Sequence, residues 1–173
     1  MTKRGDHILF IGFMGSGKTS VSKRLCAMTD LSLIDVDQRI EALQHKKIPQ
    51  IFADAGEEGF RKIETETLEG IAFEDRSIVS CGGGIICNPA NRPVLKRLGT
   101  VIYLRVPLEE AIGRISHPET RPMLSGPRPV SEIYAERLPI YEELADITID
   151  TSGLSICKVA LRCKEELEKR GLL

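Results

Sequence analysis

Short apolar runs recur along the chain at intervals that leave room for helices between them. Five such runs span residues 8–11, 31–36, 77–81, 100–104 and 147–149. Runs of this length, bounded by polar residues, are typical of strands that are buried on both faces. Strands that alternate with helical segments predict a parallel sheet in an α/β fold.

Helical periodicity is clear in three of the intervening segments, where apolar residues recur at spacings of three and four. These residues are Val21, Leu25 and Met28 after Gly17, then Leu108, Ala111, Ile112 and Ile115 after Pro107, and finally Ile156, Val159, Ala160, Cys163 and Leu167. We expect three helices that pack on the sheet, with Pro107 in the first turn of the second. With 173 residues, no internal repeat and no linker, the chain predicts one domain over residues 1–173.

A glycine-rich stretch directly follows the first apolar run. Residues 12–19 read GFMGSGKT, the complete G-x-x-x-x-G-K-[ST] pattern of a phosphate-binding loop between a strand and a helix. Its backbone N–H groups and the helix N-terminus suit phosphate oxygens, Lys18 would reach the β- and γ-phosphates, and the Thr19 hydroxyl would bind Mg²⁺. A turn that merely ends a strand is the alternative. The candidate nucleotide-binding residues here are Gly12, Gly15, Ser16, Gly17, Lys18, Thr19 and Ser20.

Two carboxylates close the second apolar run, in the sequence Asp35-Val36-Asp37. Open α/β sheets bind their ligands at the carboxyl ends of strands, so both residues are candidates for a site. Strand alternation would turn the two side chains to one side, with one near Mg²⁺ and the other near a substrate hydroxyl. The alternative is a solvated strand end, with Asp37 capping a helix that begins near Gln38.

Two further segments carry candidate substrate-binding residues. In residues 52–64 a glycine separates two helical stretches, and Arg61 and Glu64 stand one helical turn apart in the second. The arginine offers a planar fork for a carboxylate and the glutamate would hold that fork, although a surface ion pair is the alternative. Gly82, Gly83 and Gly84 follow the third run, where their bare backbone lets a ligand approach; a flexible turn is the competing interpretation.

A proline-rich, polar interruption spans residues 116–129 and looks like a loop over a site. Four arginines lie in it or beside it: Arg114, Arg121, Arg128 and Arg137. Phosphoryl transfer spreads negative charge over the transferred group, and arginines on a closing loop would stabilise that charge. Arg121, which directly precedes Pro122, is the strongest candidate among them.

The composition narrows the classes of partner. Lys and Arg total 24 against 25 Asp and Glu, which argues against a general affinity for nucleic acid or anionic membranes. The five cysteines include no C-x-x-C pair, so neither a disulfide framework nor a zinc site is indicated. Without a spanning apolar stretch or a signal-peptide core, we expect a cytoplasmic protein; without a heptad, we expect a monomer.

These motifs, taken in order, resemble the shikimate kinase family along essentially the whole chain. The carried motifs are the loop at 12–19, the Asp35-x-Asp37 pair, the stretch 52–61 with Gly56-Glu57 and Phe60-Arg61, Gly82-Gly83-Gly84, Arg121-Pro122 and Arg137-x-Pro139-x-Tyr141. The resemblance implies a P-loop NTPase fold with a five-stranded parallel sheet of order 2-3-1-4-5, helices on both faces and a mobile lid. It implies a substrate-binding region at about residues 38–64 and a lid at about 114–128. The implied activity is transfer of the γ-phosphate of ATP, with Mg²⁺, to the 3-hydroxyl of shikimate in aromatic amino acid biosynthesis.

The same resemblance implies a role for each candidate residue. Lys18 and Arg121 would contact the phosphates, Thr19 and Asp35 would hold Mg²⁺, and Asp37 would bind the substrate hydroxyls as the candidate base. Arg61 and Arg137 would bind the shikimate carboxylate with Glu64 orienting them, Gly82, Gly83 and Gly84 would offer the backbone, and Arg114 and residues 150–153 would flank the adenine.

Two other classes of protein share part of this pattern. A kinase for gluconate or a nucleoside monophosphate would share the loop and an arginine-bearing lid, but a neutral polyol gives no reason for Arg61 and Arg137. Residues 150–153 match the D-x-x-G pattern of a GTP-dependent switch, yet no Asn-Lys-x-Asp motif exists in the chain.

Overall fold

The computed structural model describes residues 5–115 and 126–173. Five parallel strands form one sheet in the order β2-β3-β1-β4-β5, as predicted. The strands are β1 (His7–Ile11), β2 (Ser32–Asp35), β3 (Ser77–Ser80), β4 (Gly99–Arg105) and β5 (Ile147–Asp150). Each of the five apolar runs therefore coincides with a strand, and no end differs by more than one residue.

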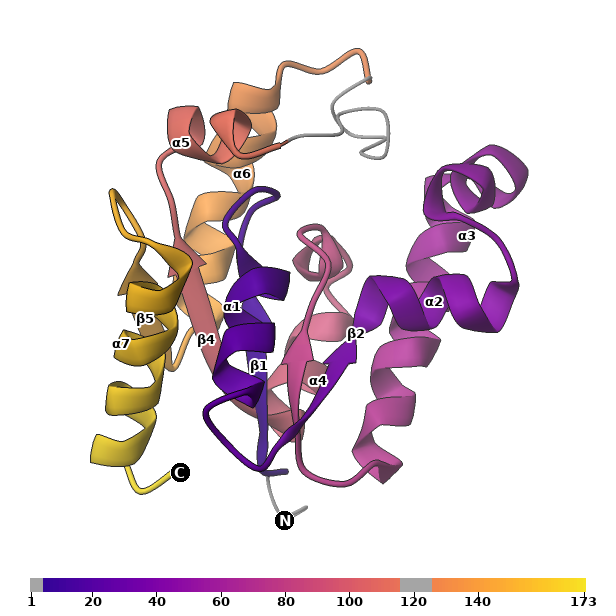
Figure 1. Ribbon diagram of the computed structural model, residues 1–173. Helices are drawn as coiled ribbons and strands as arrows, with labels where there is room; N and C mark the ends of the chain where they lie inside the picture. Colours follow the sequence, from indigo (N-terminus) through magenta and orange to yellow (C-terminus); the bar gives the residue numbers. More distant parts are fainter. Residues whose placement is uncertain (1–4, 116–125) are drawn as a thin grey trace.

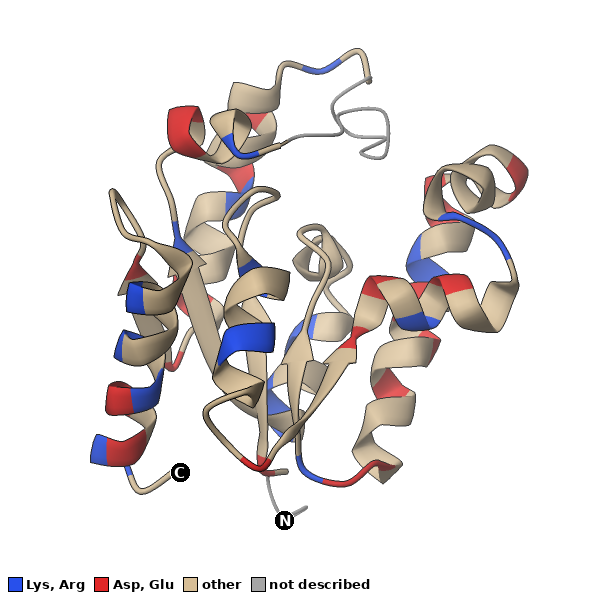
Figure 2. Ribbon diagram, viewed as in Figure 1, with Lys and Arg blue, Asp and Glu red and all other residues tan. Residues whose placement is uncertain are grey.

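Helices cover both faces of the sheet and make a three-layer structure (Figure 1). The helices are α1 (Lys18–Cys26), α2 (Val36–Gln44), α3 (Ile48–Gly70), α4 (Asn91–Leu98), α5 (Leu108–Gly113), α6 (Val130–Leu144) and α7 (Ile156–Lys169), with short 3₁₀ turns η1 (Ile71–Phe73) and η2 (Ile85–Cys87). Charged residues of both signs lie along the outer helices, as Figure 2 shows for α3 and α7.

Strand alternation divides the core into two clusters, one on each face of the sheet. Ile8 and Phe10 of β1 pack with the buried residues of α1 and α7. Leu9 and Ile11 point the other way and pack with α3, α4 and α6. Alternate residues of a strand face opposite sides, so a strand buried on both faces must be apolar throughout.

The predicted helices are present, and their apolar stripes differ in how far they are buried. In α7 the stripe is buried from Val159 to Leu167 and partly buried at Ile156, whereas in α5 Ala111 is buried and Ile112 is exposed. Pro107 stands at the N-cap of α5, one residue before the predicted first turn. Met28 lies beyond the end of α1 and packs at the edge of the core. Within the described residues, no helix is long and apolar enough to cross a membrane.

Candidate functional site

The phosphate-binding loop joins β1 to α1 at the carboxyl end of the sheet. Gly12, Gly15 and Gly17 all have positive φ, the backbone region that glycine adopts without steric cost. Gly17 stands at the N-cap of α1 without a side-chain cap, so the first turn of the helix presents its N–H groups toward the loop. This is the geometry that binds phosphate oxygens.

Lys18 is buried in this loop, with only 8% of its surface exposed. Its Nζ donates hydrogen bonds to the carbonyl oxygens of Gly12 at 2.8 Å and Phe13 at 2.9 Å, and to Ser16 Oγ at 3.3 Å. These contacts hold the ammonium against the loop, where it also lines the adjoining pocket. The predicted residues Gly12 and Ser16 thus contribute to the position of the lysine.

Three hydroxyl and carboxylate oxygens meet at the start of α1. Thr19 Oγ1 donates to Asp35 Oδ2 at 3.1 Å and lies 3.4 Å from Ser80 Oγ at the end of β3. Hard oxygen atoms of this kind are the ligands that Mg²⁺ prefers, usually as a small number of protein ligands completed by phosphates and water. The structure therefore brings together Thr19 and Asp35 and adds Ser80, which sequence reasoning missed.

Asp37 reaches the site by a different route from the one predicted. Strand β2 ends at Asp35, and α2 begins at Val36, because Asp35 Oδ1 accepts the Gln38 N–H at 3.0 Å and caps the helix. The prediction that strand alternation turns Asp35 and Asp37 to one side is therefore wrong, since Asp37 lies in the first turn of α2. The helix turn nevertheless places both carboxylates on the pocket.

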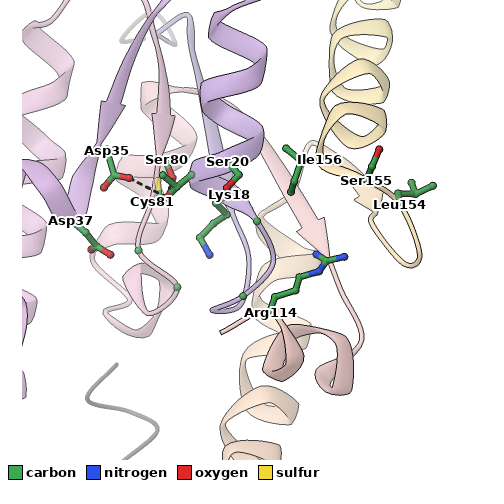
Figure 3. Close-up of a pocket in the computed structure, with 15 residues that line it drawn as sticks. Lys18, Ser20, Asp35, Asp37, Ser80, Cys81, Arg114, Leu154, Ser155 and Ile156 are labelled. Atoms are coloured by element: carbon green, nitrogen blue, oxygen red, sulfur yellow. Dashed lines mark hydrogen bonds between the residues drawn. The ribbon is translucent and has the colours of Figure 1, made fainter. Parts of the chain in front are cut away.

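A pocket of about 460 Å³ adjoins the loop at the carboxyl ends of the strands. Figure 3 shows Asp35 and Asp37 on one side of Lys18 and the side chains of Arg114 and Ile156 on the other. Its lining comprises Gly15, Gly17, Lys18, Thr19, Ser20, Asp35, Asp37, Ser80, Cys81, Gly82, Gly83, Arg114, Leu154, Ser155 and Ile156. Cys81 and residues 154–156 were not predicted. Cys81 directly precedes the predicted glycine run, and residues 154–156 directly follow the predicted 150–153 loop. Only this position next to predicted residues could have indicated that they line the pocket.

Arg61 and Glu64 form a buried ion pair on α3. The helix kinks at Gly56, which has φ of 71°. After the kink Arg61 and Glu64 lie one helical turn apart, and Arg61 Nη1 donates to Glu64 Oε1 at 2.8 Å. Glu64 is only 1% exposed, so the alternative of a surface ion pair does not describe this contact. Burial raises the pKa of Glu64 to about 7; the Arg61 guanidinium opposes the rise and the Asp37 carboxylate adds to it.

The glycine run fits between these charged side chains. A methyl group built on Gly82 would lie 2.8 Å from Asp37 Oδ1 and 3.3 Å from Glu64 Oε2. One built on Gly84 would lie 2.4 Å from Arg61 Nη2. The absence of side chains thus lets two carboxylates and a guanidinium approach the backbone at the end of β3, a closer account than the flexible turn considered as an alternative.

Arg137 enters the same cluster from α6. It is 5% exposed, and its guanidinium lies over the Phe13 ring, 5.9 Å from the centroid. One turn later Tyr141 donates a hydrogen bond from its hydroxyl to the Gly83 carbonyl. The charge of Arg137 acts on Glu64 and lowers the pKa of that carboxyl, against the larger effect of burial. Arg61, Glu64 and Arg137 therefore form one charged cluster beside Asp37.

The three described arginines in or beside the proline-rich segment, Arg114, Arg128 and Arg137, do not gather at one point. Arg114 caps α5 and lines the pocket, whereas Arg128 is exposed and pairs with Glu136 on the outer side of α6. Arg121 and most of the predicted lid at 114–128 lie outside the described residues. The candidate roles of that segment stay predictions.

The phosphate-binding loop follows the first strand of a parallel sheet of order β2-β3-β1-β4-β5 and opens on a pocket with two carboxylates. This arrangement is typical of P-loop kinases that act on small molecules. The family model for shikimate kinase matches residues 14–168. The shikimate kinase of Halorhodospira halophila is 37% identical over 166 residues, which cover 94% of each chain. That of Thiobacillus denitrificans is 39% identical over 159 residues, 90% of this chain and 86% of the other.

A solved structure, the shikimate kinase from Acinetobacter baumannii in complex with shikimate, matches with a TM-score of 0.90. It is 32% identical, and the match covers 96% of this chain and 95% of that one. The chain belongs to the shikimate kinase family and is a phosphotransferase with an alcohol group as acceptor. The predicted family, fold and enzyme class are confirmed.

Proposed function

We propose that this chain transfers the γ-phosphate of ATP to the 3-hydroxyl of shikimate and so acts in the biosynthesis of chorismate and the aromatic amino acids. The observation that carries the acceptor assignment is the Arg61 guanidinium. Its Nε is buried and has no hydrogen-bond partner among the described residues. A buried, unpaired donor of this kind is costly unless a ligand satisfies it, and a carboxylate matches the planar fork of arginine.

The acceptor would lie between the charged cluster and the phosphate-binding loop. Arg61 and Arg137 would bind its carboxylate, with Glu64 holding the Arg61 fork through the 2.8 Å contact. The backbone of Gly82 and Gly83 would contact the ring substituents. Asp37 and Glu64 both lie close to the backbone of Gly82. An acceptor whose carboxylate is bound beside Glu64 would therefore present its hydroxyl groups to Asp37.

Asp37 would accept the proton of the attacking hydroxyl as its oxygen bonds to the γ-phosphorus and the bond to the β–γ bridging oxygen breaks. Lys18, held at the loop, would neutralise charge that develops on the phosphoryl oxygens. Arg121 would add a second cation there. In this arrangement the chemistry depends on position and charge rather than on a covalent intermediate.

The residues at the start of α1 fit Mg²⁺ as the metal that accompanies ATP. Thr19 Oγ1 and Asp35 Oδ2 offer two hard oxygens 3.1 Å apart, and we propose that Thr19 binds the ion directly and Asp35 through water. No group of three or more His, Cys, Asp or Glu side chains that could hold a metal occurs in the described part of the chain. When bound, the ion would neutralise phosphate charge and align the β- and γ-phosphates.

We also propose that the enzyme works as a monomer in the cytoplasm. All five cysteines are free thiols, which suits a reducing compartment. Elution at about 19 kDa in size-exclusion chromatography with light scattering would support the monomer, for a calculated mass of 19.2 kDa.

The test of the activity is a coupled assay of ADP release with ATP and Mg²⁺, supplied in parallel with shikimate, quinate, gluconate or a nucleoside monophosphate. Stimulation by shikimate alone, with shikimate 3-phosphate as the product by NMR, supports the proposal. Turnover with gluconate or a nucleotide instead would retain the nucleotide site and refute the carboxylate-binding cluster.

A further inference from the structure

The short helix α5 is the element that joins the separate parts of the nucleotide pocket. On one side it packs against the phosphate-binding loop so closely that a methyl group on Gly15 would lie 2.2 Å from the Ala111 carbonyl oxygen. At its end it carries Arg114, whose side chain lines the pocket. A shift of α5 would therefore move both a phosphate contact and a wall of the pocket.

Glu110 of this helix uses both of its carboxylate oxygens. Oε2 accepts from Arg114 Nη2 at 3.1 Å within the helix. Oε1 accepts from the backbone N–H of Gly153 at 2.9 Å, across a separation of 43 residues. One carboxylate thus connects the guanidinium on one wall of the pocket with the loop after β5 on the other.

The loop after β5 needs this contact at one particular point. Its start is held by its own bonds: Thr151 Oγ1 donates to the Arg105 carbonyl at 3.1 Å, and Ser152 N–H donates to Asp150 Oδ1 at 2.9 Å. Gly153 has φ of 66° and stands next to Leu154, which lines the pocket. The Glu110 contact fixes the loop immediately before its pocket-lining residues.

An ordinary i,i+4 ion pair on a helix surface is the simpler account of Glu110 and Arg114. Such a pair contributes little and constrains nothing beyond its own helix. The bond to Gly153 is what distinguishes this carboxylate, because it ties the pair to a segment from the far end of the chain. A side chain that orients two walls of a binding site acts on ligand affinity through them.

We infer that Glu110 is a positioning residue for the base of the nucleotide: it holds the Arg114 guanidinium and the 153–155 backbone at the spacing that a stacked purine requires. Arginine planes stack on aromatic rings, and the flat guanidinium is useful only if its orientation is fixed. The inference rests on the proposed function in taking ATP as the ligand and in placing its base between Arg114 and the loop after β5. It assigns no contact of Glu110 with the phosphates or the acceptor.

The experiment compares nucleotide affinity with phosphate affinity. Dissociation constants for MgATP and for magnesium tripolyphosphate, which lacks a base, are measured by isothermal titration calorimetry on the wild-type chain and on Glu110→Ala and Glu110→Gln. We expect Glu110→Ala to weaken MgATP about tenfold and tripolyphosphate less than twofold. Glu110→Gln, which keeps an acceptor for Gly153 but loses the charge, should weaken MgATP about threefold.

Glu109→Gln is the matched control, because Glu109 is exposed on the same helical turn and should leave both affinities unchanged. In steady-state kinetics, Glu110→Ala should raise the KM for ATP and leave kcat within twofold. Equal weakening of MgATP and tripolyphosphate would overturn the inference, since Glu110 would then support the phosphate-binding loop. Unchanged MgATP affinity would overturn it in favour of the surface ion pair. Failure of shikimate as acceptor would refute the proposed function alone, because these binding measurements need no acceptor.

Discussion

The proposed nucleotide side and the proposed acceptor side of this site differ in the groups that would bind the ligand. On the nucleotide side, one continuous stretch, residues 12–19, supplies glycine backbone, a helix N-terminus and Lys18, whose ammonium is held by main-chain carbonyls. On the acceptor side, charged side chains from α2, α3 and α6 meet over the glycines after β3. The first is backbone geometry, and the second is side-chain charge in a buried setting.

This difference indicates which side tolerates several ligands and which side selects one. Backbone N–H groups bind phosphate whatever molecule carries it, so the nucleotide side suits many kinases. Buried charges are costly unless they are paired, so the acceptor side has to match one arrangement of charges on the ligand. Changes on the acceptor side should therefore alter acceptor kinetics and leave nucleotide binding in place.

The largest expected effect comes from substitution of Asp37, which should slow the chemical step and leave nucleotide binding unchanged. Asp37→Asn removes the proton acceptor and should lower kcat at least about a hundredfold. The dissociation constant for MgATP should stay within about twofold, because the loop is untouched. Rapid-quench kinetics and calorimetry measure the two quantities. Asp30→Asn, at an exposed carboxylate away from the pocket, is the control. An unchanged kcat in Asp37→Asn would remove this residue from the mechanism.

The second-largest expected effect comes from replacing the planar guanidinium of Arg61 on α3 with an ammonium group. Arg61→Lys keeps the charge but loses the bidentate fork and its contact with Glu64, so the KM for shikimate should rise about thirtyfold. The KM for ATP should change little. Arg97→Lys, at an exposed arginine of α4, should change neither constant. A normal KM for shikimate in Arg61→Lys would show that Arg61 does not bind the carboxylate.

The fold could be read from the sequence because its signals are local. Each strand coincides with an apolar run, and α7 follows its apolar stripe. The phosphate-binding loop was equally predictable, because its motif is one continuous stretch of sequence. The sheet order and most acceptor roles were inferred from family resemblance instead, because the residues concerned are brought together only by the fold.

Three features lay beyond local patterns. Asp37 was expected at the end of a strand, but the cap formed by Asp35 starts a helix at Val36, two residues before the start near Gln38 that the sequence suggested. Ser80 at the end of β3 lies close to Thr19 at the start of α1, a contact that no spacing of residues in the sequence predicts. The second partner of Glu110 is 43 residues away.

A smaller effect is expected where the glycine run meets the charged cluster. In Gly84→Ala the new methyl group would lie 2.4 Å from Arg61 Nη2, so the flexible guanidinium has to move. The KM for shikimate should rise about tenfold, with the KM for ATP unchanged, because displacement weakens the contact without removing the charge. Gly70→Ala is the matched control, since a methyl group there meets nothing within 4 Å. Equal kinetics for the two variants would mean that Gly84 is a simple turn.

The smallest expected effect is a dependence of the affinity for the acceptor on pH. Burial raises the pKa of Glu64 to about 7, so this carboxyl loses its proton between pH 6 and 8. Protonated Glu64 leaves the positive charge of Arg61 uncompensated, whereas ionised Glu64 neutralises it. A carboxylate ligand should therefore bind more tightly at pH 6 than at pH 8, by about threefold, and its binding should take up protons.

Calorimetry with shikimate at the two pH values measures this dependence. Glu64→Gln keeps an acceptor for Arg61 Nη1 but cannot ionise, so its affinity should be flat over the same range. Because Asp37 is unchanged in this variant, any pH dependence that persists would belong to another group and would contradict the role of Glu64. Weaker binding at pH 6 in the wild-type chain would reverse the sign of the coupling. It would mean that ionised Glu64 orients the Arg61 guanidinium. The affinity gained from this orientation would then exceed the affinity lost when Glu64 neutralises the charge of Arg61.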